Sequence, residues 1–354
     1  MAQKLPRDLT RPVMVGDVQI GGGAPVVVQS MTCTPTSDTE ATLSQVRALA
    51  ACGCDVVRVT LPNRAAIESF RAVCAASPVP IIADIHFDYR LAIAAVEAGA
   101  AKLRINPGNI GSWEKVDAVI DAAGAAGAAI RIGVNAGSLE EDLAARDDLT
   151  QPEKLVASSL RFVEHFEERG FTDIVLSAKA HSVPTTIETY RALSRELPQV
   201  PLHIGVTEAG TVQQGTIKSA VGIGVLLSEG IGDTMRVSLT ADPTEEPPVA
   251  WGILQCLGLR RRGPEIVSCP TCGRTQVDLI PIAQEVERRL RTCTKPVSVA
   301  VMGCVVNGPG EASDADVGVA CGKGVALLFK HGEPIRKVAE AEIVDALMEE
   351  IDKL

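Results

Sequence analysis

The chain has 354 residues, enough for about two domains of ordinary size. Its net charge of −10 and pI near 5.1 argue against nucleic acid as the main partner, because binding to a phosphate backbone requires a basic face. The residues are 46% hydrophobic but only 3% aromatic, so we expect a core packed mainly from Ala, Val, Ile and Leu.

The cysteine usage and the N-terminal segment indicate a compartment. Ten cysteines are spread over the chain with no secretory pattern, which favours reduced thiols in a cytoplasm over a disulfide framework. The segment from Met1 to Gly16 mixes Lys, Arg, Asp and Pro and resembles no signal peptide. No apolar run approaches the ~18 residues that a membrane span requires. We therefore expect a cytoplasmic protein without a membrane partner.

A strand–helix rhythm follows a short predicted hairpin at Pro12 to Gly23. Eight apolar, mostly β-branched runs alternate with Ala- and Leu-rich segments of helical period, which indicates a parallel sheet buried on both faces. Eight such units in about 250 residues predict a (β/α)8 TIM barrel rather than a doubly wound sheet. The runs are Val26–Val28, Val56–Val59, Ile81–Ile85, Lys102–Ile105, Ile130–Val134, Ile174–Leu176, Leu202–Val206 and Met235–Leu239, and the helical segments are 39–52, 63–75, 89–98, 112–125, 151–169, 184–197, 212–229 and 244–258.

Polar side chains gather at the carboxyl ends of the predicted strands, where barrel enzymes build their active sites. Five of them are cations, which are costly to bury unless an anion compensates them. Guanidinium groups bind phosphate through paired hydrogen bonds, so this cluster favours a ligand with two phosphate groups over separate ion pairs with neighbouring carboxylates. The cations are Arg58, Arg104, Arg131, Lys179 and Arg236, and the other polar residues at these ends are Asp84, His86, Asn106, Asn135, Ser177, Thr207, Glu208 and Ser238.

Three of these residues are candidates for proton transfer or substrate contact. Glu208 follows the seventh strand and is a candidate general acid, with a salt bridge to Arg236 as the alternative. Asp84 and His86 alternate with apolar isoleucines, so both are expected to point into the barrel mouth. A histidine in a strand is either a substrate contact or a structural group, and the sequence leaves both open for His86.

The rhythm stops at a basic stretch closed by proline, Arg260 to Pro264, which indicates a domain boundary. We expect residues 1–262 to form the substrate-binding barrel and residues 263–354 to form a small α+β domain around a metal site. Its predicted elements are a helix from Pro281 to Thr292, strands at Val297–Met302, Val317–Ala320, Val325–Lys330 and Glu333–Lys337, and a final helix from Lys337 to Leu354.

Two cysteine motifs in this second domain predict the metal centre. Cys269 and Cys272 can present both sulfurs to one metal from a single turn, and Cys304 ends a predicted strand. Three thiolates are an incomplete set, because structural zinc and cubane iron–sulfur clusters prefer four ligands. Glu311 follows Cys304 across a Gly-Pro-Gly turn, and its carboxylate would hold soft iron loosely. Loose ligation suits a site where substrate replaces a ligand.

Other cysteines are alternatives for the fourth ligand. Cys293 and Cys321 lie nearby in the sequence, whereas those in or beside the barrel segments are expected to act as small hydrophobes. The Cys-Pro-x-Cys-Gly-Arg turn alone fits a zinc knuckle equally well. The missing fourth thiol, combined with a barrel built for an anion, favours iron–sulfur.

These motifs carry a resemblance to a known family. The segments are Cys-Pro-Thr-Cys-Gly-Arg-Thr at 269–275, Val-Met-Gly-Cys-Val-Val-Asn-Gly-Pro-Gly-Glu at 301–311, and further motifs at 29–32, 83–87, 104–109, 131–135 and 205–210. Together they resemble the 4-hydroxy-3-methylbut-2-enyl diphosphate synthases of the methylerythritol phosphate route to isoprenoids. The resemblance spans nearly the whole chain and matches the shorter bacterial form, which has a barrel and a cluster domain.

The resemblance implies a two-electron reduction, with loss of water, that opens the ring of 2-C-methyl-D-erythritol 2,4-cyclodiphosphate to give (E)-4-hydroxy-3-methylbut-2-enyl diphosphate. It implies a [4Fe–4S] cluster whose carboxylate ligand is exchangeable, electrons from reduced flavodoxin or ferredoxin, and a head-to-tail homodimer. Glu208 matches the barrel acid. The cluster ligands that match are Cys269, Cys272, Cys304 and Glu311, and the diphosphate-binding positions that match are Arg58, Arg104, Arg131, Asn135, Lys179, Arg236 and Ser238.

Two alternatives stay open. One is a different barrel iron–sulfur lyase or reductase that acts on another phosphorylated substrate. The other is non-enzymatic, a barrel with a structural zinc module that mediates association. Iron and zinc analysis separates the zinc module from both enzymes, because only the enzymes require about four irons per chain.

Overall fold

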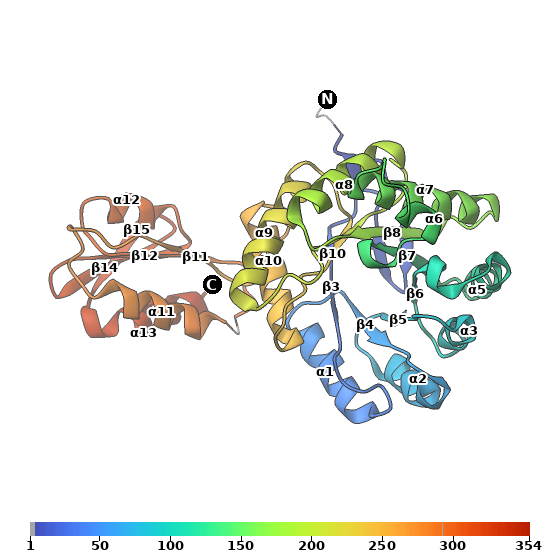
Figure 1. The fold of residues 1–354 in the computed structure, drawn as a ribbon. Helices are drawn as coiled ribbons and strands as arrows, with labels where there is room; N and C mark the ends of the chain where they lie inside the picture. The colour runs from blue at the N-terminus through green and yellow to red at the C-terminus, as the bar shows by residue number, and fades with distance from the viewer. Residues whose placement is uncertain (1–3, 292) are drawn as a thin grey trace. The chain divides into compact units, whose positions relative to one another are not determined.

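The computed structural model describes residues 4–291 and 293–354, and the chain divides into two compact units, Met1–Arg260 and Arg261–Leu354. The first unit is a parallel eight-stranded barrel surrounded by helices (Figure 1). Its strand order, β8-β7-β6-β5-β4-β3-β10-β9, follows the sequence around the wall. The strands are β3 (Val27–Met31), β4 (Val56–Thr60), β5 (Ile81–Asp84), β6 (Lys102–Ile105), β7 (Ala129–Asn135), β8 (Ile174–Lys179), β9 (His203–Ile204) and β10 (Thr234–Met235).

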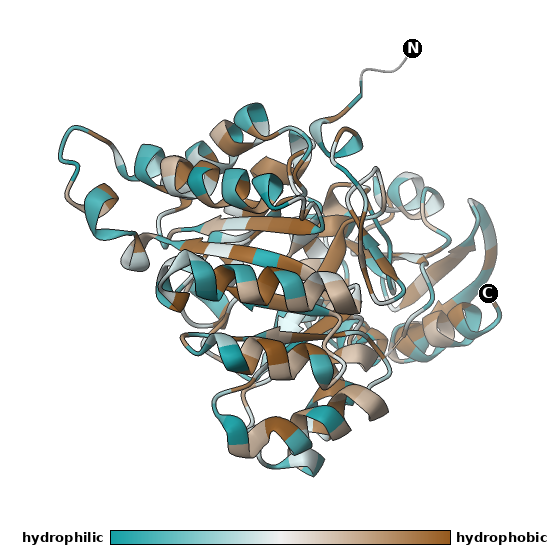
Figure 2. Cartoon of the chain, turned by 90° about the vertical axis from the view of Figure 1, so that its right-hand side faces the viewer, coloured by the Kyte–Doolittle hydropathy of each residue, from teal (hydrophilic) through white to brown (hydrophobic). Residues whose placement is uncertain are grey.

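The barrel helices begin and end close to the predicted bounds, and several of the amphipathic segments have a capping residue at their start. Asp38 caps α1 by accepting from the Ala41 amide (3.0 Å), and Thr150 with Glu153 forms a capping box on α7. Apolar and polar residues alternate along these helices (Figure 2). The helices are α1 (Thr39–Ala51), α2 (Ile67–Ala76), α3 (Tyr89–Glu97), α4 (Pro107–Ile110), α5 (Trp113–Ala126), α6 (Glu141–Ala144), α7 (Gln151–Glu168), α8 (Val183–Glu196), α9 (Val212–Ser228) and α10 (Glu246–Cys256).

The N-terminal hairpin closes the floor of the barrel. Strands β1 (Val13–Val15) and β2 (Val18–Ile20) pair antiparallel around Gly16, whose φ of +61° suits glycine. They bury Val13, Val15 and Ile20 against the first inward-facing layer of the barrel, which comprises Val27, Val56, Ile82, Ala129 and Val175. This layer is buried and apolar, so any polar layer above it is sealed from solvent at that end.

The barrel wall closes between β8 and β9 by a single parallel bridge, Leu176 with Leu202. A side chain supplements this weak seam. The buried Tyr190 hydroxyl, from α8, donates to the His203 carbonyl (2.6 Å) and accepts from the Ala178 amide (3.2 Å). It therefore joins the two strands where ladder hydrogen bonds are scarce.

The second unit is a five-stranded mixed sheet of order β11-β12-β13-β14-β15, in which the first three strands are parallel. Apolar residues of β12 and β13 pack with helices α11 and α13 on one face, and α12 covers the other face. Gly318 in β13 allows this second contact, because a Cβ there would lie 2.6 Å from the Ala312 carbonyl. The elements are β11 (Glu265–Ser268), α11 (Leu279–Leu290), β12 (Ser298–Met302), α12 (Gly308–Ser313), β13 (Val317–Cys321), β14 (Val325–Lys330), β15 (Glu333–Ala339) and α13 (Ile343–Asp352).

Two predictions for this unit were wrong in detail. The final helix begins at Ile343 rather than Lys337, because β15 continues to pair with β14 as far as Ala339. The Cys304–Glu311 segment is not a simple turn, since it enters helix α12 at Gly308. Strand β11 was not predicted at all. The predicted end of the first helix, Thr292, lies outside the described residues.

No helix among those described is long and apolar enough to cross a membrane.

Removing the Tyr190 hydroxyl should weaken the barrel seam. Tyr190→Phe leaves the Ala178 N–H and the His203 C=O without a partner, so we expect the free energy of unfolding to fall by about 1–3 kcal/mol in urea titrations. Tyr89→Phe, at the chain's other tyrosine, is the control and should change it by less than about 0.5 kcal/mol. Equal effects of the two substitutions would show that the bridge contributes nothing.

Asp233, beneath the barrel floor, should make stability depend on pH. It accepts from the Leu202 amide (2.7 Å) and the Thr10 hydroxyl (2.8 Å), and burial raises its pKa from 3.8 to about 6. Because the folded pKa is raised, the protonated form is favoured, and its contribution to stability is lost as pH rises through 6. Relative to Asp233→Asn, the wild type should lose up to about 3 kcal/mol of unfolding free energy between pH 4 and 7.5. A pH-independent difference between the two proteins would refute this assignment.

Candidate functional site

Cationic side chains point into the barrel from neighbouring strands. The strand register fixes this direction, because Arg58, Ile82 and Lys102 are successive partners, and Ile82 belongs to the inward apolar layer. Arg104 is likewise the partner of Asp84 and of Arg131. Residues two positions apart on a strand share a face, so the whole set faces the interior. The inward cations are Arg58, Lys102, Arg104, Arg131, Lys179 and Arg236.

Two buried carboxylates contact these cations. Asp84 lies 3.2 Å from Arg104 Nη1 and 3.8 Å from Arg58 Nε, and it also faces His86 Nε2 at 3.4 Å. Burial alone would raise the pKa of Asp84, but Arg58, His86 and Arg104 together hold that pKa far below its ordinary value. Asp84 is therefore an anion that fixes the positions of two arginines.

Glu246, at the start of α10, is the second carboxylate. It accepts from Arg236 through both oxygens (3.0 and 3.1 Å), from the Ser30 hydroxyl (2.7 Å) and from the Leu239 amide (3.2 Å). The salt bridge of Arg236 is thus formed with Glu246, and the alternative partner considered for Glu208 is wrong. Glu208 is exposed, and its backbone φ is +53°. A left-handed conformation is strained for a residue with a side chain and is frequent at functional sites.

Positive charge exceeds negative charge inside the barrel. Lys179 and Arg131 are buried without a carboxylate partner among the described residues. Burial, followed by the surrounding arginines, lowers the pKa of Lys179 well below its ordinary value. Burial likewise lowers the pKa of Arg58 to about 10, although Asp84 opposes this effect. The arrangement is costly as it stands, and an anionic ligand would relieve it.

Two glycines make room for the charged groups. A Cβ on Gly133 would lie 2.9 Å from Arg104 Nε, and a Cβ on Gly205 would lie 2.9 Å from Lys179 Nζ. In β7 and directly after β9, therefore, missing side chains provide the space that Arg104 and Lys179 occupy. This space was not foreseen from the sequence, where the same glycines only interrupt apolar strands.

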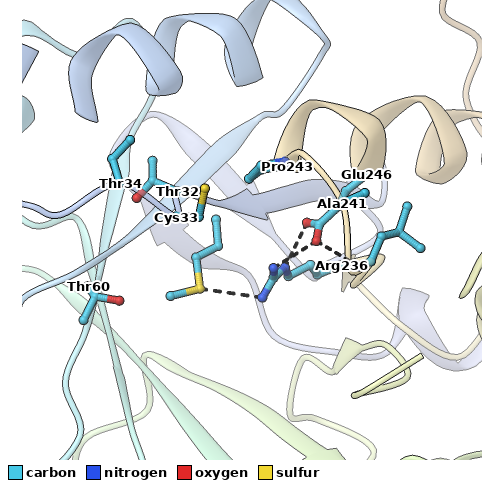
Figure 3. A pocket seen from close by; sticks show the side chains of 10 residues that line it. Thr32, Cys33, Thr34, Thr60, Arg236, Ala241, Pro243 and Glu246 are labelled. Carbon is cyan, nitrogen blue, oxygen red and sulfur yellow. Dashed lines mark hydrogen bonds and ion pairs between the residues drawn. The ribbon is translucent and has the colours of Figure 1, made fainter. Parts of the chain in front are cut away.

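A cavity of about 390 Å³ opens at the carboxyl ends of β3, β4 and β10 (Figure 3). Arg236 and Glu246 line it together with Met31, whose sulfur accepts from Arg58 Nη2 (2.8 Å) and faces Arg236 Nη1 (3.6 Å). The Met31 thioether thus separates two guanidinium groups that no carboxylate bridges. The remaining lining residues are Thr32, Cys33, Thr34, Thr60, Leu239, Ala241 and Pro243.

The other predicted barrel residues differ in how free their side chains are. Asn135 accepts from Arg104 Nη2 (3.1 Å) in the amide orientation that satisfies its neighbours. Ser177 is buried in register with Gly133, and Ser238 is half-buried just past β10. Asn106 is fully engaged, because it caps α4 through the Gly108 amide (3.1 Å) and donates to the Ser138 hydroxyl (2.9 Å). These hydrogen bonds stabilise the loop that follows β6.

Sequence reasoning missed several polar residues of the interior. Gln29, Lys102 and His203 lie one layer deeper than the strand ends, and all three are buried. Lys102 could have been found, because it alternates with Arg104 across Leu103 and so shares its face. Glu246 gave no comparable signal, since it reaches the barrel from a helix start.

In the second unit, Cys269 and Cys304 follow the adjacent parallel strands β11 and β12. Both therefore lie at the carboxyl ends of these strands, on the same edge of the sheet. Ser268 is the register partner of Val301, and the Cys269 amide donates to the Val301 carbonyl (3.4 Å). The Gly303 amide donates to Cys269 Sγ (3.3 Å), and the Gln276 amide donates to the Gly303 carbonyl (2.9 Å). The loop that carries Cys272 is thus held against the turn that carries Cys304.

Backbone donors favour the thiolate form of two of these cysteines. Amides of Asn307, Val306 and Gly308 lower the pKa of Cys304, and the Arg274 amide lowers that of Cys272. Cys321, at the end of β13, is different: burial in the apolar core raises its pKa to about 12. This distinction counts against Cys321 as a metal ligand.

Glu311 is exposed on α12, which packs against β12 and β13 through Ala312. Throughout residues 4–291 and 293–354, no group of three or more His, Cys, Asp or Glu side chains is arranged closely enough to hold a metal ion. The predicted ligands thus lie on neighbouring segments of one sheet edge without forming a closed ligand set.

Comparisons with known proteins agree over both units. The model of the GcpE TIM-barrel domain matches residues 10–251, and that of the GcpE protein C-terminal domain matches residues 265–353. The chain is 54% identical to the 4-hydroxy-3-methylbut-2-en-1-yl diphosphate synthase (flavodoxin) of Geobacter sulfurreducens, over 98% of each chain. It is 52% identical to the protein of the same name from Lawsonia intracellularis, over 98% of this chain and 97% of that one.

Among solved structures, the 7,8-dihydropteroate synthase of Vibrio fischeri ES114 aligns with 70% of this chain and 99% of its own. The TM-score is 0.50 and the identity 11%, so this likeness shows the barrel fold alone.

Filling the space beside Arg104 should weaken anion binding. Gly133→Ala places a methyl group 2.9 Å from Arg104 Nε, so the guanidinium must move from its present position. We expect the affinity for inorganic diphosphate, measured by calorimetry, to fall roughly tenfold, as for the loss of one charged hydrogen bond. Gly137→Ala is the control, since a Cβ there meets nothing within 4 Å. Unchanged affinity in Gly133→Ala would exclude Arg104 from the anion site.

Proposed function

The chain belongs to the 4-hydroxy-3-methylbut-2-en-1-yl diphosphate synthase family, the GcpE proteins, and we propose that it catalyses the reaction for which the family is named. The substrate is 2-C-methyl-D-erythritol 2,4-cyclodiphosphate. Two electrons and two protons are consumed. One C–O bond of the ring is broken, and one hydroxyl group leaves as water. The product is (E)-4-hydroxy-3-methylbut-2-enyl diphosphate, an intermediate of isoprenoid synthesis.

The observation that carries this proposal is the excess of buried positive charge in the barrel. A cyclic diphosphate brings two phosphate groups, which is the ligand chemistry that such a set of cations lacks. We assign Arg58, Arg104, Arg131, Lys179 and Arg236 to the diphosphate, because they face one interior. Asn135, Ser177 and Ser238 supply neutral hydrogen bonds, and Asp84 with His86 orients Arg58 and Arg104 from the side. Asn106 supports the loop after β6.

Glu208 is the proposed proton donor of the barrel. Glu208 is exposed in the loop after β9. Its backbone has a positive φ, which glycine adopts without strain but which is unfavourable for glutamate. Proton transfer to the departing hydroxyl needs a group within hydrogen-bond reach of it.

The second unit is proposed to hold a [4Fe–4S] cluster through Cys269, Cys272, Cys304 and Glu311. The donors suit iron, because three soft thiols share one sheet edge, and backbone amides favour the thiolate at Cys272 and Cys304. When bound, the cluster would supply the two electrons. Glu311, as the single hard oxygen donor, is the ligand most easily replaced.

The electron donor and the assembly are proposals as well. The curated relatives are named as flavodoxin enzymes, which supports reduced flavodoxin over ferredoxin. We propose a cytoplasmic head-to-tail homodimer, in which the barrel of one copy meets the cluster of the other. Cross-complementation between a barrel-dead and a cluster-dead variant in mixed dimers is the measurement that bears on this arrangement.

Replacing the carboxylate ligand should separate cluster binding from turnover. In anaerobically purified Glu311→Ala we expect about four irons per chain but roughly 100-fold slower consumption of the cyclodiphosphate with a chemical reductant. Glu333→Ala, at an exposed residue of β15, is the control and should match the wild type in both measurements. Full activity in Glu311→Ala would remove it from the ligand set. Stoichiometric zinc in the wild type would favour the structural-module alternative, and iron without cyclodiphosphate turnover would favour a different substrate.

A further inference from the structure

A second group of buried polar residues lies inside the barrel, and it includes Arg131, which is also one of the residues assigned to the diphosphate. It contains Gln29, Lys102, Arg131 and His203, whose exposed fractions are 1%, 0%, 2% and 0%. Below it, the apolar floor of Val27, Val56, Ile82, Ala129 and Val175 separates it from the N-terminal hairpin. The layer is therefore closed on one side by hydrocarbon and on the other by the cations of the barrel mouth.

Polar atoms in this layer have no hydrogen-bond partner among the described residues. They are Lys102 Nζ, Arg131 Nε and Nη1, His203 Nε2, and both side-chain polar atoms of Gln29. Buried polar groups in folded proteins are almost always paired with protein, water or a ligand. So many orphaned groups in one layer, most of them donors, indicate that something other than the chain completes their hydrogen bonding.

The charges around Lys102 make the missing group an anion. Arg131 from β7 and Arg58 from β4 act on Lys102, and both repel it. His203, from β9, faces the same cations together with Lys179 from β8. Among the carboxylates that contact the barrel cations, Asp84 is already shared by Arg58, Arg104 and His86. A buried ammonium without a counter-ion is unfavourable, and burial with this repulsion lowers the pKa of Lys102 well below its ordinary value.

We propose that this layer is an inner anion site, centred on Lys102 Nζ, that takes one monoatomic anion such as chloride. An eight-stranded barrel has an interior just wide enough for side chains or one small ligand, which favours a halide over a polyatomic anion at this depth. The Gln29 amide and the free Arg131 N–H groups supply further donors. The anion lets Lys102 remain an ammonium and leaves the guanidinium groups of Arg58, Arg104 and Arg236 available to a phosphate ligand.

The site is tested in the substrate-free full-length protein, so its failure would not affect the proposed reaction. Crystals grown in sodium bromide are measured at the bromine absorption edge. We expect an anomalous peak in contact with Lys102 Nζ in the wild type and in Lys179→Met, which removes a cation at the mouth. The peak should be absent in Lys102→Met. No peak in the wild type, water alone in the layer, or a peak that persists in Lys102→Met would each overturn the proposal.

Thermal unfolding gives an independent readout that needs no variant crystal. At equal ionic strength, replacing sodium gluconate with sodium bromide should raise the wild-type Tm by about 2–4 °C when the halide is in roughly tenfold excess over its Kd. Lys102→Met should show no halide-specific rise, even if loss of the buried charge raises its Tm in both salts. An equal halide response in wild type and Lys102→Met would place the anion elsewhere.

Discussion

Uncompensated positive charge inside the barrel is the constraint on which the rest of the structure depends. In an acidic protein, cations are easily neutralised at the surface, yet here six of them are gathered inside the barrel from five strands, β4, β6, β7, β8 and the end of β10. Within the described part of the chain, Asp84 and Glu246 are the carboxylates that form ion pairs with them. Such an arrangement opposes folding unless the wall that holds it is strong. It therefore indicates a surface prepared for an anion rather than one produced by packing alone.

The wall meets this demand with specific local devices. An apolar floor seals the lower end, so that the cations are open to solvent only from the mouth of the barrel. Gly133 and Gly205 leave the volume that Arg104 and Lys179 fill. Tyr190 joins β8 to β9, where a single bridge closes the wall, by hydrogen bonds to Ala178 and His203. The Met31 sulfur sits between two guanidinium groups, where a polarizable atom accepts hydrogen bonds without adding charge.

Much of this was accessible from the sequence, and the exceptions have physical reasons. Apolar runs and helical periods predicted the barrel strands and helices, because burial on both faces gives a strong pattern. Reading only the strand ends missed Lys102 and His203, which lie deeper on the same faces. The partner of Arg236 could not be predicted, since Glu246 approaches through tertiary structure. The start of α13 was misplaced because sheet pairing with β14 outweighed the helical preference of residues 337–339.

The two units present complementary electrostatic problems. In the barrel, the cations outnumber the carboxylates that contact them, and the proposed partners are a phosphorylated ligand and a small anion. At the sheet edge of the second unit, backbone amides stabilise negative charge on Cys272 and Cys304 before any metal is bound. A lowered pKa makes it easier for these thiols to lose the protons that metal binding displaces. Each unit is thus prepared for its proposed ligand, and binding in each unit would contribute folding stability as well as chemistry.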